Sequence, residues 1–202
     1  MSKPLKIAAL CAAGLLALSG CGSSPATHFY VLSAVPAERP AEAGADIALG
    51  VGPLELPEYL DRPQIVTRSG QNELNLGEFD RWGAPVKDNA TEVLAENLAV
   101  LLPSNKISTY PWKRSAQIQY QVAAKITRFD RTEGGEAVLS ARWRLLDGEG
   151  EELLARESRY AESPTGADYG DTVAAMNRLL AQWSREVALA VNSLRGSAGA
   201  RK

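Results

Sequence analysis

Three consecutive segments between residues 118 and 161 alternate apolar and polar side chains, and this alternation places the strongest constraint on the fold. Successive side chains of a β-strand point to opposite faces, so such a segment is typical of a strand with one buried face. The apolar positions are Ile118, Tyr120, Val122, Ala124 and Ile126 in the first segment, and Ala137, Leu139, Ala141, Trp143 and Leu145 in the second. Gly134-Gly135 and Asp147-Gly148 supply the turns, and residues 151–161 return as a third strand. The sequence therefore predicts an antiparallel meander with one buried and one solvated face.

Two other segments have helical spacing. Apolar residues recur at every third or fourth position over residues 86–101, where Pro85 fits the first turn and Pro103 closes the end. A longer stripe over residues 168–194 contains Met176 and Trp183, and at this spacing it indicates a core face more than a cofactor site. Gly196 is expected to end this helix, and residues 196–202 are predicted to form a disordered tail.

Shorter strands complete the predicted fold. Residues 28–33, 47–51 and 106–109 have strand-like composition, and residues 64–68 and 73–76 flank a turn in a plausible hairpin. The order is strands, helix, strands, helix, without a visible repeat. We expect one α+β domain over residues 28–195, in which two amphipathic helices cover one face of a two-layer structure. The sheet is predicted to be mostly antiparallel, with a mixed sheet as the alternative.

The N-terminus has the layout of a secretory signal peptide over residues 1–20. Lys3 and Lys6 precede a twelve-residue run without charge, from Ile7 to Leu18, which is too short to cross a membrane as a helix. No later segment is apolar enough to be a transmembrane helix. Cys11 would be removed with the signal peptide, so the mature chain would keep one cysteine and form no internal disulfide.

Leu18-Ser19-Gly20-Cys21 resembles the bacterial lipobox, which implies lipid attachment to the Cys21 sulfur and cleavage before it. Ordinary cleavage after Ser19 is the alternative, but it would leave an unexplained exposed thiol. Two or more acyl chains would anchor the protein stably in a membrane. The small and polar residues that follow Cys21 make residues 21–27 a lipidated flexible tether in this prediction. In lipoproteins of diderm bacteria, an aspartate directly after the lipidated cysteine resembles a signal for retention at the inner membrane. This chain has Gly22 at that position. The expected location is therefore the periplasmic face of the outer membrane.

Catalytic and metal-binding motifs are not found in the sequence. The one histidine, His28, lies beside the tether, and no phosphate-binding glycine loop, zinc motif or nucleophile elbow is present. Glu55, Glu58 and Asp61 cluster in sequence, but no spacing fixes a carboxylate pair of the glycosidase kind. We expect no enzyme activity, no metal and no cofactor apart from the covalent lipid. The formal net charge of −2 implies no nucleic-acid partner.

The segment between the second and third predicted strands, residues 51–68, is the best candidate for a binding surface. It holds three prolines with apolar and charged side chains, so we expect a stiff loop. In one interpretation its apolar residues (Leu54, Leu56, Tyr59 and Leu60) plug the end of the sheet. In the other the loop is a preordered surface for a protein partner, since Tyr59 and Arg62 are residue types favoured at the centres of interfaces.

"LPEYLDRPQIVTR", followed by "GEFDRWGAP", resembles the auxiliary lipoproteins of MCE-type and ABC-type transport systems, the paraquat-inducible protein C family. The likeness also includes the early "FYVLSA" strand and the terminal helix. Residues 83–85 depart from the family pattern, because Ala84 stands where the family tends to have glutamate. The predicted partner-binding residues are Leu56, Pro57, Tyr59, Leu60, Asp61, Arg62, Pro63, Arg81 and Trp82.

The resemblance implies a non-enzymatic accessory or docking subunit of an intermembrane lipid transport system that contributes to envelope integrity. Its partners would be an MCE-domain protein that spans the periplasm and the inner-membrane permease, with homo-oligomerisation left open. Two alternative functions remain open. One is a periplasmic carrier with its own apolar lipid cavity between sheet and helices, and the other is a periplasmic hydrolase.

Overall fold

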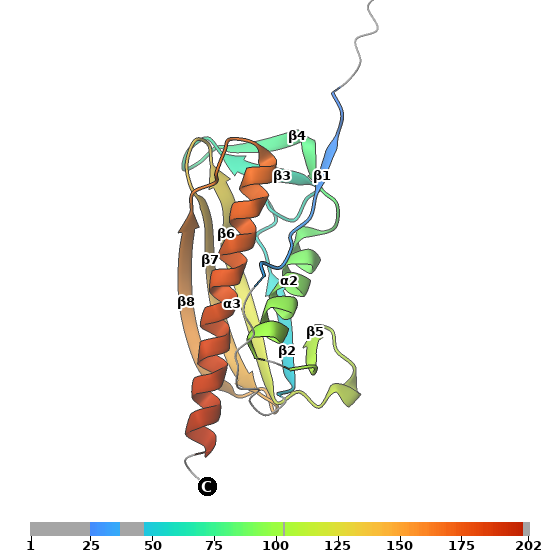
Figure 1. Ribbon diagram of the computed structural model, residues 1–202, viewed down its shortest axis with the longest axis vertical. Coiled ribbons are helices and arrows are strands. Elements are labelled where there is room, and N and C mark those ends of the chain that lie inside the picture. Colours follow the sequence, from blue (N-terminus) through green and yellow to red (C-terminus); the bar gives the residue numbers. More distant parts are fainter. Residues whose placement is uncertain (1–24, 37–46, 103, 200–202) are drawn as a thin grey trace, which may run out of the picture.

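One curled sheet and two long helices make up the described part of the chain (Figure 1). The computed structural model describes residues 25–36, 47–102 and 104–199, so the predicted signal peptide, Cys21 and most of the tether lie outside the described residues. The elements are β1 (His28–Tyr30), β2 (Leu49–Glu55), β3 (Gln64–Arg68), β4 (Leu74–Trp82), α2 (Val86–Leu101), β5 (Ile107–Thr109), the 3-10 turn η1 (Arg114–Ala116), β6 (Tyr120–Thr132), β7 (Ala137–Asp147), β8 (Glu152–Glu162) and α3 (Tyr169–Gly199).

The long strand β6 organises the sheet. On one side it pairs antiparallel with β7, which pairs antiparallel with β8, as the meander predicted. Its other side pairs in parallel with β2 over residues 120–125 and with β3 at residues 131–132. β4 pairs antiparallel with β3, and the two short strands β5 and β1 lie parallel to β2 and β4, respectively.

The prediction of a mostly antiparallel sheet was wrong, and the mixed alternative is correct. Four of the seven pairings between described strands are parallel. The physical reason is that a parallel and an antiparallel strand alternate their side chains in the same way, so periodicity fixes the buried face but not the direction. The parallel pairing of β2 with β6 depends on a crossover that includes α2, which comes from packing and not from either strand alone.

An irregularity in β6 changes which side chains face the helices. The register with β7 shifts between Ile126 and Arg128. Beyond the shift, Phe129 is buried in the core, and the next residue, Asp130, instead bonds the loop that follows β2. Arg131 in turn bonds α3 and the segment before it. Without the bulge, Arg131 would point away from the helices; the shift instead turns Arg131 toward α3 and Asp130 toward the other face.

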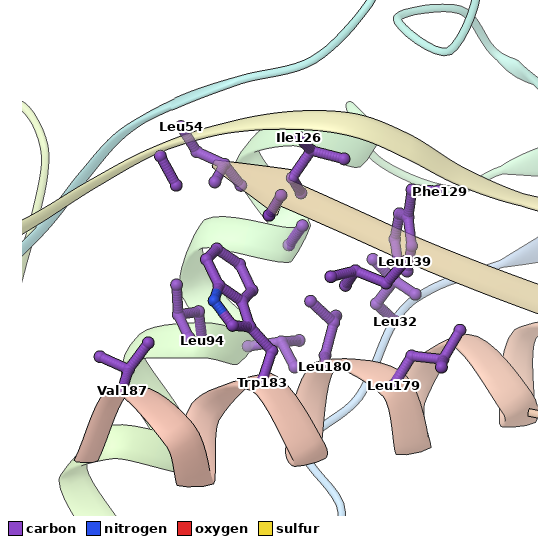
Figure 2. Close-up of a cluster of buried hydrophobic side chains, with 14 of the residues drawn as sticks. Leu32, Leu54, Leu94, Ile126, Phe129, Leu139, Leu179, Leu180, Trp183 and Val187 are labelled. Carbon is purple, nitrogen blue, oxygen red and sulfur yellow. The ribbon is translucent and has the colours of Figure 1, made fainter. Parts of the chain in front are cut away.

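Both helices pack on one face of the sheet, as predicted. α2 contacts β2 and β5, and α3 contacts β6, β7 and β8 and also α2. Figure 2 shows Trp183, Leu180 and Val187 of α3 meeting Leu94 of α2 and Ile126 of β6. The interior is filled by fully buried side chains: Trp143, Trp183, Phe129, Ile47, Leu49, Ile65, Leu94, Leu98, Leu102, Ile126, Leu139 and Leu145. A carrier would need a lipid cavity at this place, where the side chains instead pack against one another.

The last helix begins where it was predicted but ends later. Asp168 precedes its first residue and accepts a hydrogen bond from the backbone N–H of Asp171 at 2.7 Å, which is an N-cap. At the other end α3 continues through Gly196 to Gly199, so residues 196–199 are helical and do not begin a disordered tail. Glycine weakens a helix by about 1 kcal/mol, which is too little to stop one that is long and packed on one side.

Polar contacts join α3 to the outer strand of the meander. Glu186 of α3 accepts hydrogen bonds from Ser158 and Tyr160 of β8, each at 2.5 Å. Ser158 also accepts the indole N–H of Trp143, at 2.9 Å. The edge of the core is therefore closed by a connected and satisfied polar network.

Candidate functional site

The loop after β2, residues 56–63, lies along β6 between the places where β2 and β3 pair with it. A turn forms its centre, in which the Leu60 N–H donates to the Pro57 carbonyl at 2.9 Å. Leu60 is buried, and Leu56 and Tyr59 are partly buried against the core. The plug interpretation is therefore correct for these three residues, which hold the loop in place.

Tyr59 belongs to a charged cluster near the C-terminal end of β6. Its hydroxyl donates to Asp130 Oδ2 at 3.1 Å. Asp130 is fully buried and receives two guanidinium groups, from Arg68 and Arg128, each at 2.9 Å. The Arg68 guanidinium also lies 5.1 Å from the centre of the Tyr59 ring. Burial and the Asp130 carboxylate raise the pKa of the Tyr59 hydroxyl, so Tyr59 is a structural donor in the interior.

The outer part of the same loop forms one wall of a surface groove. The groove has a volume of about 370 Å³ and is lined by Asp61, Arg62, Pro63, Trp82, Gly83, Ala84 and Pro85. We call these seven residues the docking groove. Its walls are joined through the backbone, because the Trp82 N–H donates to the Pro63 carbonyl at 2.7 Å. Trp82 is buried, whereas the other six residues are exposed.

Two exposed apolar side chains of the N-terminal segment lie beside the docking groove. Phe29 is 66% exposed and Val31 is 53% exposed. The Gly83 N–H donates to the Tyr30 carbonyl at 2.7 Å, and a Cβ at Gly83 would lie 3.2 Å from Val31 Cγ1. The groove and these two exposed apolar side chains are therefore continuous, which extends the surface on which a partner could bind.

Four of the predicted partner-binding residues meet in the docking groove: Asp61, Arg62, Pro63 and Trp82. Leu56, Pro57, Tyr59 and Leu60 do not line it, and neither does Arg81, whose Nε donates to the Glu78 carbonyl at 3.4 Å. The contributions of residues 83–85 and of β1 to this surface were not predicted from the sequence. Their only sequence signal was the Gly-Ala-Pro break before the helix and the apolar run of residues 29–32.

The acids that could have supported a hydrolase are dispersed. Glu55 lines a cavity on the sheet face away from the helices, Asp61 lines the docking groove, and Glu58 lines neither. Within the described ranges, no three His, Cys, Asp or Glu side chains are placed to hold a metal ion. His28 is exposed, with Nδ1 3.4 Å from Asp80. In the same part of the chain, no helix is long and apolar enough to span a membrane.

Comparison with known families decides the class of protein. The family model described as the ABC-type transport auxiliary lipoprotein component matches residues 30–188. The chain belongs to this family. The match includes the docking groove and most of α3, so the auxiliary lipoprotein domain is the folded part of the chain described above. Transport association and lipoprotein character are family properties.

Solved structures share the auxiliary lipoprotein fold. A crystal structure of a Xanthomonas campestris protein is 17% identical, with a TM-score of 0.71 over 87% of this chain and 100% of that chain. A second crystal structure, of an uncharacterized protein, is also 17% identical, with a TM-score of 0.67 over 83% of this chain and 99% of that chain. The comparison with curated proteins gives no match. At this level of identity, these two structures establish the fold alone.

Proposed function

We propose that this chain is a lipid-anchored, non-enzymatic docking subunit of an MCE-type or ABC-linked system that moves lipids between membranes and contributes to envelope integrity. Membership of the auxiliary lipoprotein family supports the transport association. The observation that carries the docking role is the groove in which Asp61, Arg62 and Pro63 meet Trp82. Its partner in this proposal is the MCE-domain protein, which connects to the inner-membrane permease.

The chemistry of the docking groove suits a protein partner. An indole forms its buried part, prolines stiffen two of its edges, and one acidic and one basic residue stand at its exposed wall. Interfaces combine an apolar centre with a polar rim, and aromatic and arginine side chains are enriched at their energetic centres. A stiff loop also loses little entropy when it binds. An inserted apolar side chain from the partner, flanked by a charged pair, is the arrangement that this groove accepts best.

The anchor brings the groove close to a membrane in this proposal. Fully extended, the seven residues from 21 to 27 span at most about 25 Å. They lead directly into β1, which lies against the docking groove. An outer-membrane lipoprotein with a short tether would therefore present the groove at the membrane surface, where a partner that crosses the periplasm must arrive.

Intact-mass analysis of the protein extracted from membranes tests the anchor. We expect a mature chain that begins at Cys21 and carries acyl groups, and fractionation should recover it with the outer membrane. A Cys21→Ala variant should leave the membrane fraction. An unmodified mature chain that begins at Gly20 would contradict the anchoring part of the proposal.

Co-purification tests the docking role. Ala84→Trp fills the docking groove, and Arg62→Glu reverses the charge at its wall, while both positions are exposed. We expect each variant to lose co-purification with the MCE-domain subunit at an unchanged melting temperature. Arg185→Glu, on the exposed side of α3 and outside the groove, is the matched charge control and should keep the partner. Retention of the partner by both groove variants would contradict the assignment of this surface.

A further inference from the structure

Arg131 is a buried cation without a carboxylate partner. Its residue is only 8% exposed, and within the described ranges no acidic group lies within 4.0 Å of its guanidinium. One nitrogen, Nη1, donates to the Ala167 carbonyl at 3.1 Å and to Thr172 Oγ1 at 2.9 Å. Nε is buried and has no hydrogen-bond partner. Two neutral oxygens therefore accept hydrogen bonds from Nη1, and among the described residues no carboxylate compensates the positive charge.

The neighbouring Asp130 is also a buried charged residue, but its charge is compensated. Asp130 is fully buried and is compensated by two arginines and a tyrosine hydroxyl. A buried ion is costly unless it is paired and hydrogen-bonded, so arginines of such low exposure normally have a carboxylate or phosphate partner. If Arg131 only tied β6 to the segment before α3, an uncharged donor of similar length would do so without this cost. The missing partner therefore points to an anion that is not part of the chain.

A pocket stands where such an anion would bind. Its volume is about 290 Å³, and it is lined by Thr67, Asn75, Arg131, Glu133, Gly134, Ala167, Tyr169 and Thr172. The first turn of α3 forms one side. The acids at that helix start are already engaged, since Asp168 caps the helix and Asp171 accepts a hydrogen bond from Thr165 at 2.5 Å. Glu133, the acidic residue of the lining, is exposed and receives the Asn75 amide at 3.2 Å.

We propose that this pocket binds a phosphate group, with Arg131 as its charged ligand. Arginine presents a planar fork of N–H donors that matches the oxygens of phosphate. The Thr172 hydroxyl already donates to the Asp168 carbonyl at 3.0 Å. The lining adds the hydroxyl groups of Thr67 and Tyr169 and the second N–H of the Asn75 amide, which can donate to phosphate oxygens. The phosphate comes either from a phospholipid headgroup or from a free phosphate compound. The elements that line the pocket include β3, β4 and the start of α3, which lie at the end of the domain where the described chain begins (Figure 1).

The first arm of the test uses inorganic phosphate and the full mature lipoprotein in detergent. Phosphate should raise the melting temperature and shift the arginine Nε–H resonance of Arg131, whereas sodium chloride of equal ionic strength should do neither. Asn75→Asp keeps the size of the side chain, removes the amide that donates to Glu133 and adds a negative charge to the lining, so we expect phosphate affinity to fall by at least about tenfold. Arg131→Gln should abolish the response. Asn72→Asp and Arg159→Gln, at positions outside the pocket, should respond as the unsubstituted protein does.

The second arm identifies the source of the phosphate. The lipoprotein is placed in vesicles of phosphatidylethanolamine and phosphatidylglycerol, and in vesicles of a phosphate-free galactolipid. Slower hydrogen exchange of residues 165–175 in the phospholipid vesicles alone, lost in Asn75→Asp, assigns the headgroup. A response to inorganic phosphate without a vesicle effect assigns a free anion. No response in either arm, or equal responses in the Asn75→Asp and Asn72→Asp proteins, would overturn the proposal.

Discussion

Tyr59 donates its hydroxyl to Asp130, 3.1 Å away, and so joins the loop after β2 to the C-terminal part of β6. The loop carries three residues of the docking groove on its outer side. The position of the groove wall therefore depends on the charge cluster around the buried Asp130, and no residue of this cluster lines the groove. This separates residues that build the surface from residues that would contact the partner, and the two groups should respond differently to substitution.

Removal of the charge of Asp130 should destabilise the fold strongly. In Asp130→Asn the Arg68 and Arg128 guanidinium groups lose their shared counter-charge, and breaking a buried pair in this way costs about 3 kcal/mol or more. Glu157→Gln breaks the exposed pair with Arg142 and should cost no more than about 0.5 kcal/mol. Urea unfolding of both variants checks the difference. Equal stability losses would show that the cluster does not hold the loop.

Tyr59→Phe should destabilise the loop that carries the groove less than Asp130→Asn does. The substitution removes one hydrogen bond to a charged acceptor, so the free energy of unfolding should fall by about 1.5 to 3 kcal/mol. Hydrogen exchange should speed up over residues 56–63 more than over the meander. Partner binding should weaken only as far as the loop loosens, which distinguishes Tyr59 from Arg62. A Tyr59→Phe protein of full stability that has lost its partner would instead make Tyr59 a contact residue.

The two fully buried tryptophans should differ in their tolerance of phenylalanine. Trp143 donates its indole N–H to Ser158 at 2.9 Å, whereas the Trp183 Nε1 is buried without a hydrogen-bond partner. Both replacements leave a cavity, but only Trp143→Phe also loses a hydrogen bond. We expect Trp143→Phe to be the more destabilising by about 1 kcal/mol in urea unfolding. The reverse order would contradict the bonding described for the core.

The parts of the fold that could be predicted from the sequence are those with one buried face. The alternation of residues 118–127 and 137–145 and the stripe that contains Trp183 each follow from the geometry of a strand or helix against a core. The direction of β2 beside β6 could not be predicted, since it depends on packing between segments about seventy residues apart. The passage of α3 through Gly196 likewise depends on packing that outweighs a local propensity.

Only part of the candidate site could be predicted from the sequence, because residue type alone does not show which side chains the packing buries. Arg62 and Trp82 were singled out by residue type and by the family resemblance, and the docking groove does bring them together. The role of Tyr59 could not be decided from the sequence, because tyrosine is equally suited to an interface and to a buried hydrogen bond. The burial of Arg131 could not be predicted, because a polar residue in an alternating strand is expected to face solvent. Only the bulge after Ile126 turns it toward the helix.

Stability should fall at alkaline pH partly through Tyr30. Burial, together with the hydrogen bond to Asp80 and its charge, raises the pKa of Tyr30 to about 12 from 10.0. Between these values the folded chain holds a proton that the unfolded chain releases, so this stabilising contribution is complete below pH 10 and is lost as the pH rises toward 12. Tyr30→Phe should therefore lose less stability than the unsubstituted protein over this range. Urea midpoints measured at several pH values check this, with the exposed Tyr110→Phe as control.

Cross-linking in living cells tests the docking groove most directly. A photo-reactive phenylalanine derivative replaces Ala84 in the groove or, as a control, Arg185 on the exposed side of α3. We predict a light-dependent adduct with the MCE-domain subunit from position 84 and none from position 185. No adduct from position 84, or equal adducts from both positions, would contradict the claim that this groove receives the transport partner.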